Sequence, residues 1–264
     1  MSIEHSPSDM IVTVTGDVTL DALQKHIARN GQWLPIDPPS PETVTIEKLL
    51  SENMSGPRRH RFGTIRDYTL GIAAVLADGR VIHSGGKVVK NVAGYDLQKL
   101  FIGGEGTLGK IVEATFKLRP LPEVERFFEQ ECSSLVEAGR LIEEMLDLDF
   151  LVLDLRWPHT VIIGINRENM GKTGKNHPIH PCTLAYDAEF RTRPGIQKVS
   201  VLPSKLIETV EKLGNRPFVA RAGNGIIYYE GPPIQVDKPV LPRHLFQRVK
   251  DAYDPSHRLP SLPA

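Results

Sequence analysis

The sequence predicts an α+β protein of two domains, and three observations support this. After Gly109, apolar and polar residues alternate through Leu118, which is the pattern of a half-buried strand. The segment Pro120-Leu121-Pro122 then breaks the chain and indicates a domain boundary. Beyond it, strands and helices follow in an order close to β-α-β-β-α-β, which predicts a sheet with two helices on one face.

The first elements follow from local periodicity. Residues Met10 to Thr15 alternate as a strand, and Thr19 can cap a helix over Leu20 to Arg29. Gly31 closes that helix, and Gln32 to Pro39 form an extended segment stiffened by prolines.

A hairpin and a short helix are expected next. Tyr68 to Leu76 is a buried strand, Asp78-Gly79 is a turn, and Arg80 to Ser84 returns as the partner strand. A helix from Tyr95 to Ile102 places apolar side chains on one face, and Gly103 ends it.

Seven of the 22 glycines fall between Gly85 and Gly109. Gly104, Gly106 and Gly109 have the spacing of a dinucleotide fingerprint, but a helix enters this loop and a strand leaves it, which is the reverse of a Rossmann turn. Glycines also let a backbone approach a ligand closely and turn its amides into an anion-binding nest. The other interpretation is that they only serve tight turns.

Composition excludes several classes of function. The 264 residues carry 32 basic and 32 acidic side chains, so nothing indicates a nucleic-acid or anionic-membrane partner. No apolar run approaches the roughly 20 residues of a membrane helix, and the first ten residues lack the features of a signal peptide, so we expect a cytoplasmic location. Cys132 and Cys182 are isolated, so this chain alone offers neither a disulfide framework nor a metal or iron–sulfur site.

Several motifs occur together in a specific order. They are Ser55-Gly56-Pro57-Arg58-Arg59, Gly63-Thr64-Ile65-Arg66-Asp67, Leu76-Ala77-Asp78-Gly79-Arg80, Lys90-Asn91-Val92-Ala93-Gly94-Tyr95-Asp96-Leu97 and Gly103-Gly104-Glu105-Gly106-Thr107-Leu108-Gly109. In this order and spacing the sequence resembles the FAD-binding domain of the vanillyl-alcohol oxidase family, also called the PCMH-type flavoproteins, and within it the FAD-binding subunits of bacterial glycolate oxidases. The likeness is dense from about Thr13 to Pro122.

The resemblance implies FAD as the cofactor and assigns a set of contacts to it. The implied cofactor-binding residues are Ser55, Gly56, Lys90, Asn91, Gly94, Tyr95, Asp96, Gly103, Gly104, Glu105, Gly106, Thr107, Gly109 and Ile111. No metal site is expected.

Two departures from the family concern how tightly FAD is held. Relatives place a strand–helix–strand unit with a pyrophosphate-binding glycine loop before the equivalent of Met10, and no glycine precedes Met10 here. The chain is therefore a fragment or wrongly started, or it has given up tight FAD binding. In addition, Thr43 to Met54 carries Glu47, Lys48, Leu49, Leu50 and Glu52 where relatives have small residues close to the flavin ring. Arg58, Arg59 and Arg61 follow, either as donors to a phosphate or carboxylate or as a solvated turn.

We expect residues 1–120 to form an N-terminally incomplete FAD-binding domain, 121–232 a small ferredoxin-like cap domain, and 233–264 a returning C-terminal segment. The last contains a helix from about Arg243 to Tyr253. Family members take their carboxylate-binding and base residues from the cap and the tail. The possible counterparts are Arg221, Tyr228, Tyr229, His244 and His257, and no catalytic role is assigned to any of them.

The resemblance implies an FAD-linked oxidoreductase subunit that takes part in oxidising a small 2-hydroxy acid such as glycolate. Its partners would be a catalytic flavoprotein subunit and an iron–sulfur subunit. The alternative is a flavin-free structural or assembly subunit of such a complex. A third hypothesis, an enzyme with another ligand in the old cofactor cleft, has the least support.

Overall fold

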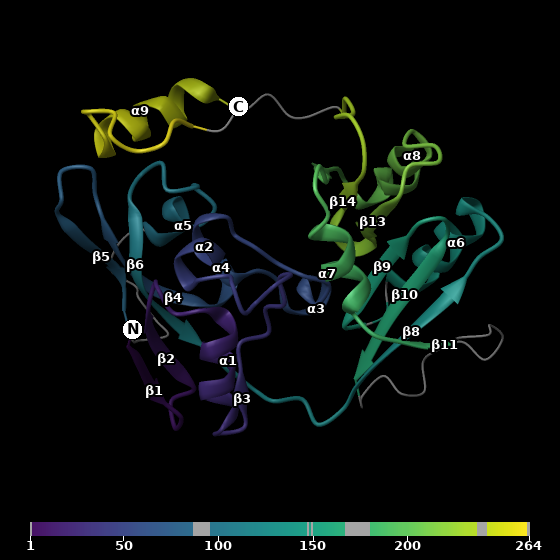
Figure 1. The fold of residues 1–264 in the computed structure, drawn as a ribbon, viewed down its shortest axis with the longest axis horizontal. Coiled ribbons are helices and arrows are strands. Elements are labelled where there is room, and N and C mark those ends of the chain that lie inside the picture. The colour runs from purple at the N-terminus through teal and green to yellow at the C-terminus, as the bar shows by residue number, and fades with distance from the viewer. Residues whose placement is uncertain are drawn as a thin grey trace.

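The first half of the protein is organised on a five-stranded antiparallel sheet (Figure 1). The structure is a computed structural model, and it describes residues 2–86, 96–146, 148, 150–166, 180–236 and 242–262. In spatial order the strands are β1 (Ile3–Ser6), β2 (Ile11–Thr15), β6 (Lys110–Lys117), β4 (Thr69–Val75) and β5 (Val81–Gly85). The central strand, β6, is the last of the five along the chain. The alternation after Gly109 gives it a row of buried side chains, and it pairs with both β2 and β4.

Short helices pack against this sheet. They are α1 (Leu20–Ala28), α2 (Ile46–Ser51), α3 (Arg59–Phe62), α4 (Ile65–Tyr68) and α5 (Gln98–Phe101). The side chains of Thr19 and Thr45 accept hydrogen bonds from backbone amides in the first turns of α1 and α2. Leu49 and Leu50 of α2 are fully buried in the core. The bulky segment that sequence places near a flavin ring thus turns its apolar side chains inward.

A two-stranded pairing of β3 (Gln32–Trp33) with β7 (Arg119–Pro120) closes the first domain before the chain enters a second sheet. That sheet has seven antiparallel strands. Their spatial order is β11 (His180–Cys182), β8 (Glu125–Glu131), β10 (Thr160–Asn166), β9 (Val152–Arg156), β13 (Phe218–Arg221), β14 (Ile226–Tyr229) and β12 (Gln197–Ser200).

The second sheet contains two β-α-β-β units. The first consists of β8, α6 (Leu135–Leu146), β9 and β10, and the second of β12, α8 (Leu206–Glu211), β13 and β14. In each unit the third strand lies between the first and the second, and the units join where β9 pairs with β13. This order differs from the predicted ferredoxin-like β-α-β-β-α-β arrangement, because α6 and α8 are each followed by their own pair of strands. The domain limits 1–120, 121–232 and 233–264 stay a prediction.

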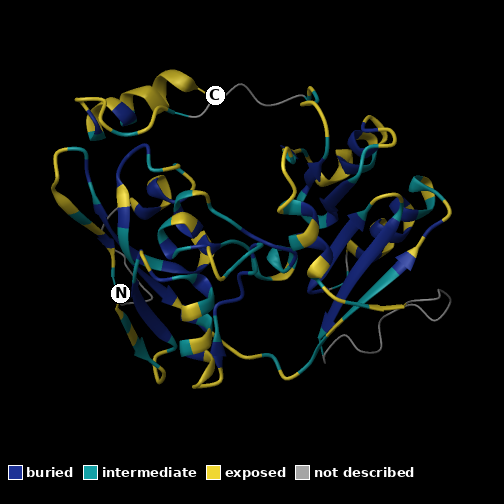
Figure 2. Ribbon diagram, viewed as in Figure 1, coloured by how far each residue is buried: buried dark blue, intermediate teal, exposed yellow. Residues whose placement is uncertain are grey.

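The two faces of this sheet are covered differently. Helices α6 and α8 share one hydrophobic core on one face, as the sequence predicts. On the other face, Tyr186 and Phe190 of α7 (Ala185–Arg191) pack on alternate strand residues such as Val152 and Val219. Sequence reasoning missed α7, and it missed β1 in the first sheet. Figure 2 shows the central strands of the second sheet buried along most of their length.

The C-terminal helix α9 (Arg243–Tyr253) has the predicted bounds and returns to the first domain (Figure 1). Val249 and Tyr253 pack against the first hydrophobic core, and the ring of Tyr253 meets Phe101 edge-on at 5.6 Å. Most of the other α9 side chains are exposed. The other predicted elements of the first domain are confirmed within one or two residues, except that the described part of the helix after Asp96 is the single turn of α5.

Candidate functional site

The predicted ligand loop, Gly103 to Gly109, connects α5 to β6. Its backbone amides bond within the protein. The amide of Gly103 donates to the carbonyl of Leu50 at 2.9 Å, and that of Glu105 donates to the carbonyl of Ser51 at 2.9 Å. The amides of Gly104 and Thr107 donate to carbonyls of the same loop region. Four amides are thus committed to carbonyls of the chain, and the role of the loop as a ligand cradle stays a prediction.

The glycines of this loop serve its turns and its packing. Gly103 and Gly106 adopt positive φ angles of 79° and 73°. A Cβ atom at Gly109 would lie 2.8 Å from the carbonyl oxygen of Val75 and 3.0 Å from the Phe101 ring. Around Gly106, by contrast, a Cβ would meet nothing within 4 Å. Only at Gly106 does the loop leave room for an approaching ligand.

Ser55 and Gly56 lie at the contact between the two domains. The Ser55 carbonyl accepts a hydrogen bond from Nη1 of Arg191 at 2.7 Å. A Cβ at Gly56 would overlap the carbonyl oxygen of Asp37. Gly56 is therefore needed because two segments of the chain meet there.

The other predicted contacts are scattered. Asp96 is exposed and pairs with Lys99 at 2.6 Å. Ile111 is buried in the middle of the first sheet, opposite Ala74. Lys90, Asn91, Gly94 and Tyr95 lie outside the described residues. The assignment of all these positions to FAD stays a prediction.

A buried ionic cluster occupies the α7 face of the second sheet. Arg221, on β13, donates to the carboxylates of both Asp154 and Asp187. The hydroxyl of Tyr186 also donates to Asp154, at 2.5 Å. Burial raises the pKa of Asp154 to about 6, although Arg221 and Tyr186 oppose the shift. No pattern in the sequence indicates this cluster, because its members are far apart in the chain.

Two further arginines, Arg191 and Arg58, make hydrogen bonds at the contact between the two domains. Arg191 bonds to Asp187 at 3.2 Å and stacks on Tyr228 with its guanidinium 4.2 Å from the ring centre. Arg58, from the first domain, bonds to Glu125 at 2.5 Å and to Asp37 at 3.1 Å.

Arg58 also sits between two aromatic rings, 5.6 Å from the centre of Trp33 and 5.3 Å from that of Phe127. Burial raises the pKa of Asp37 to about 7 despite the nearby Arg58. Thus Arg58, Arg191 and Arg221 all have carboxylate partners inside the protein.

In the described part of the chain, three further features bear on function: the reactivity of the thiols, possible metal sites and the length and apolar character of the helices. Burial raises the pKa of Cys132 and of Cys182 to about 11, so neither thiol is a ready nucleophile. Within the described ranges, no three His, Cys, Asp or Glu side chains come together as a possible metal site. Among the described helices, none combines the length and the apolar character needed to cross a bilayer.

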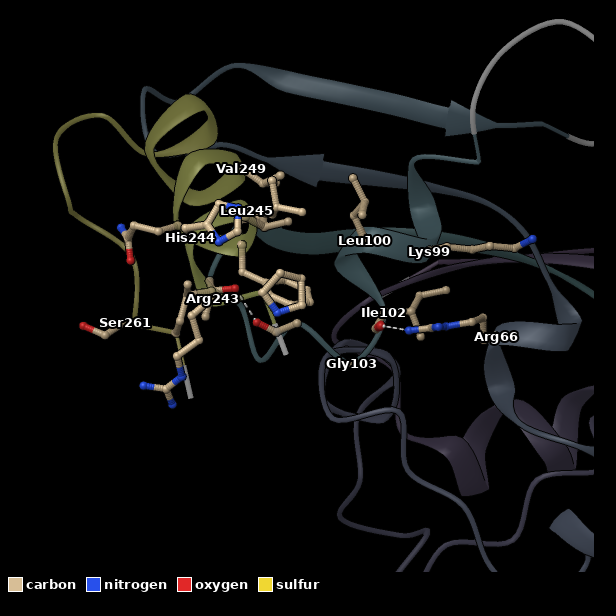
Figure 3. Close-up of a pocket in the computed structure, with 17 residues that line it drawn as sticks. Arg66, Lys99, Leu100, Ile102, Gly103, Arg243, His244, Leu245, Val249 and Ser261 are labelled. Carbon is tan, nitrogen blue, oxygen red and sulfur yellow. Dashed lines mark hydrogen bonds between the residues drawn. The ribbon is translucent and has the colours of Figure 1, made fainter. Parts of the chain in front are cut away.

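A cavity of about 970 Å³ lies beside the glycine-rich loop, between α5 and α9 (Figure 3). Gly103, Gly104 and Thr107 contribute to its wall. Helix α9 is fixed there by Lys250, whose buried ammonium donates to the Thr107 carbonyl at 2.8 Å and to Asp254 at 2.5 Å. Burial opposes ionisation of Asp254, but Lys250 and two backbone amides lower its pKa to about 2.

A diphosphate such as that of FAD needs several converging amides or cations in place of water. In the loop, four amides are already bonded to carbonyls, and the arginines of the domain contact are paired with carboxylates. Four amides of the loop are therefore unavailable to a diphosphate.

Several curated proteins are similar to about half of this chain. Two of the relatives are glycolate oxidase subunit GlcD of Bacillus subtilis, 42% identical over 125 residues, and glycolate oxidase subunit GlcE of Escherichia coli, 34% identical over 143 residues. A D-lactate dehydrogenase of Archaeoglobus fulgidus is 43% identical over 118 residues. These alignments cover 47%, 54% and 45% of this chain, and 26%, 41% and 26% of the respective relative.

The chain thus spans well under half the length of these relatives. In fold, it is similar to alkyldihydroxyacetonephosphate synthase, with a TM-score of 0.67 at 15% identity, over 96% of this chain and 63% of that one. Residues 2–85 match the family model described as FAD binding domain, which supports FAD as the cofactor. This match of residues 2–85 agrees with the resemblance that the motifs predict.

Proposed function

We propose that this protein is a subunit of an FAD-linked complex that oxidises a small 2-hydroxy acid such as glycolate or D-lactate. The observation that carries the proposal is the 34–43% identity of about half of the chain to proteins named as glycolate oxidase subunits and D-lactate dehydrogenase. A catalytic flavoprotein subunit and an iron–sulfur subunit are the proposed partners. A cytoplasmic location stays a prediction.

The geometry suggests what this chain contributes to such a complex. A 2-hydroxy acid needs a cation for its carboxylate, and Arg58, Arg191 and Arg221 already neutralise carboxylates of the protein. We infer that the substrate-binding cations come from another subunit or from residues of this chain outside that cluster. Arg191, through the Ser55 carbonyl, and Arg58, through Glu125, bond across the contact between the second sheet and the first domain.

We also propose that the isolated chain binds FAD weakly. Hydrogen bonds to a charged acceptor are worth roughly 1.5–3 kcal/mol each. Four amides of the Gly103–Gly109 loop donate to carbonyls of the chain, so FAD gains no hydrogen bond of this kind from them. The same observation favours the second candidate, a flavin-free assembly subunit of the complex.

Two measurements test the proposal. Calorimetric titration of the purified chain with FAD should give no binding tighter than about 10 µM. A submicromolar Kd would refute weak binding. The complex, assembled with and without this chain, is then assayed for dye reduction by glycolate and by D-lactate. The function requires that activity falls when the chain is omitted, and unchanged activity would contradict it.

The flavin content of the assembled complex separates the two candidates. One FAD bound per copy of this chain, in addition to that of the catalytic subunit, supports the FAD-holding role. FAD in the catalytic subunit alone supports the assembly role. The variant Gly106→Ala is a control for the preparation and should leave assembly of the complex intact. A Cβ at this position meets no other atom within 4 Å, and the positive φ angle destabilises an alanine by only about 1–2 kcal/mol.

A further inference from the structure

The cavity between α5 and α9 has mostly apolar walls. Figure 3 shows Leu245 and Val249 of α9 on one side and Leu100 of α5 on the other. Leu100, Leu245 and Phe246 are 44%, 47% and 48% exposed, and they are three of the ten large hydrophobic residues that are exposed in the described part of the chain. Exposed apolar side chains that gather around one concavity indicate a binding surface rather than scattered surface residues.

The charged side chains among the described lining residues of the cavity are all basic. Arg66, Lys99, Arg243 and His244 line it, and the lining residues that the structure describes include no aspartate or glutamate. Lys99 pairs with Asp96, which lies outside the lining. Arg66 donates to the Ile102 carbonyl at 2.6 Å and has no carboxylate partner among the residues that the structure describes. Its charge is therefore available to an anion.

The cavity is formed in advance, because its two walls are tied together. Lys250 of α9 bonds to the glycine-rich loop through Thr107, and Tyr253 packs on Phe101 of α5. A volume of about 970 Å³ lies within the range of roughly 300–1,000 Å³ that small-molecule sites occupy. A ligand would not have to order α9 before binding.

We propose that this cavity binds an anion with a hydrocarbon body, an acyl carboxylate or an alkyl phosphate. The hydrocarbon lies between α5 and α9, against Leu100, Leu245 and Phe246, and the anionic group lies against Arg66. This site does not use the ionic cluster, but it shares a wall, formed by Gly103, Gly104 and Thr107, with the predicted FAD contacts, so the nucleotide probe below separates the two.

Calorimetric titration of the full chain with four probes, below their micelle concentrations, tests the proposal. Dodecanoate and dodecyl phosphate should bind, dodecanol should bind about tenfold more weakly because it lacks the charge, and ADP should not bind. The tighter of the two alkyl anions identifies the headgroup. Equal binding of dodecanol would overturn the role of the charge. Tighter binding of ADP than of either alkyl anion would assign the cavity to a nucleotide and overturn the proposal.

Variants locate the site. Phe246→Ser should weaken dodecanoate binding about tenfold, while Leu202→Ser, a control at a residue that is 70% exposed on the second domain, should leave it unchanged. Arg66→Gln should abolish the preference for dodecanoate over dodecanol, and Arg66→Lys should retain most of it. Thermal unfolding confirms that each variant folds. Equal effects of Phe246→Ser and Leu202→Ser would refute the location.

Discussion

Replacing Asp37 with asparagine should make the stability of the protein less dependent on pH. Burial raises the pKa of Asp37 from 3.8 to about 7 in the folded protein. The folded state therefore binds this proton more tightly than the unfolded state does. The resulting stabilisation is fully present below pH 3.8 and is lost as the pH rises through about 7. Between pH 5 and 8, linkage gives a loss of about 2.5 kcal/mol in the free energy of unfolding, which the asparagine variant should not show.

The assay is urea unfolding of both proteins, followed by circular dichroism, at pH values from about 5 to about 8. The amide introduced by Asp37→Asn would retain an oxygen acceptor for Arg58, which now bonds to Asp37 Oδ2 through its backbone amide and through Nη1. Asp154, whose pKa is raised to about 6, titrates in the same direction but is present in both proteins. Asp251→Asn, at an exposed position on α9, is the matched control. Parallel pH curves for the wild type and Asp37→Asn would refute the reasoning.

Two further predictions concern residues that the tertiary structure constrains. Arg221→Met leaves the carboxylates of Asp154 and Asp187 buried without their cation, so urea unfolding should show that the free energy of unfolding falls by about 3–5 kcal/mol. A fall of less than about 1 kcal/mol would contradict a buried ion pair. Gly225→Ala should destabilise by about 2 kcal/mol more than Gly214→Ala. Both glycines have positive φ, but only at Gly225 would a Cβ overlap a carbonyl oxygen, that of Val201. Equal midpoints in thermal unfolding would contradict that difference.

Local chemistry determined most of the elements from sequence. Alternation after Gly109 predicted β6, Thr19 predicted the start of α1, and Asp78-Gly79 predicted the turn between β4 and β5. Each depends on residues within one turn or one strand, so the pattern is visible without the fold. The likeness of the motifs to an FAD-binding domain is also a property of the sequence, and the family match of residues 2–85 bears it out. Helix α7 was missed because its two core residues, Tyr186 and Phe190, give a single helical repeat.

The tertiary structure alone decided where polar groups find their partners. The glycine pattern of the loop predicts amides turned toward a ligand, yet Gly103 and Glu105 donate to carbonyls of α2, some fifty residues earlier in the chain. Likewise, Arg221 could be read as a substrate anchor until the sheet placed it beside Asp154, across the junction of two β-α-β-β units. Periodicity specifies which side of an element is buried. Hydrogen bonds and ion pairs depend on distances between elements, which exist only once the chain has folded.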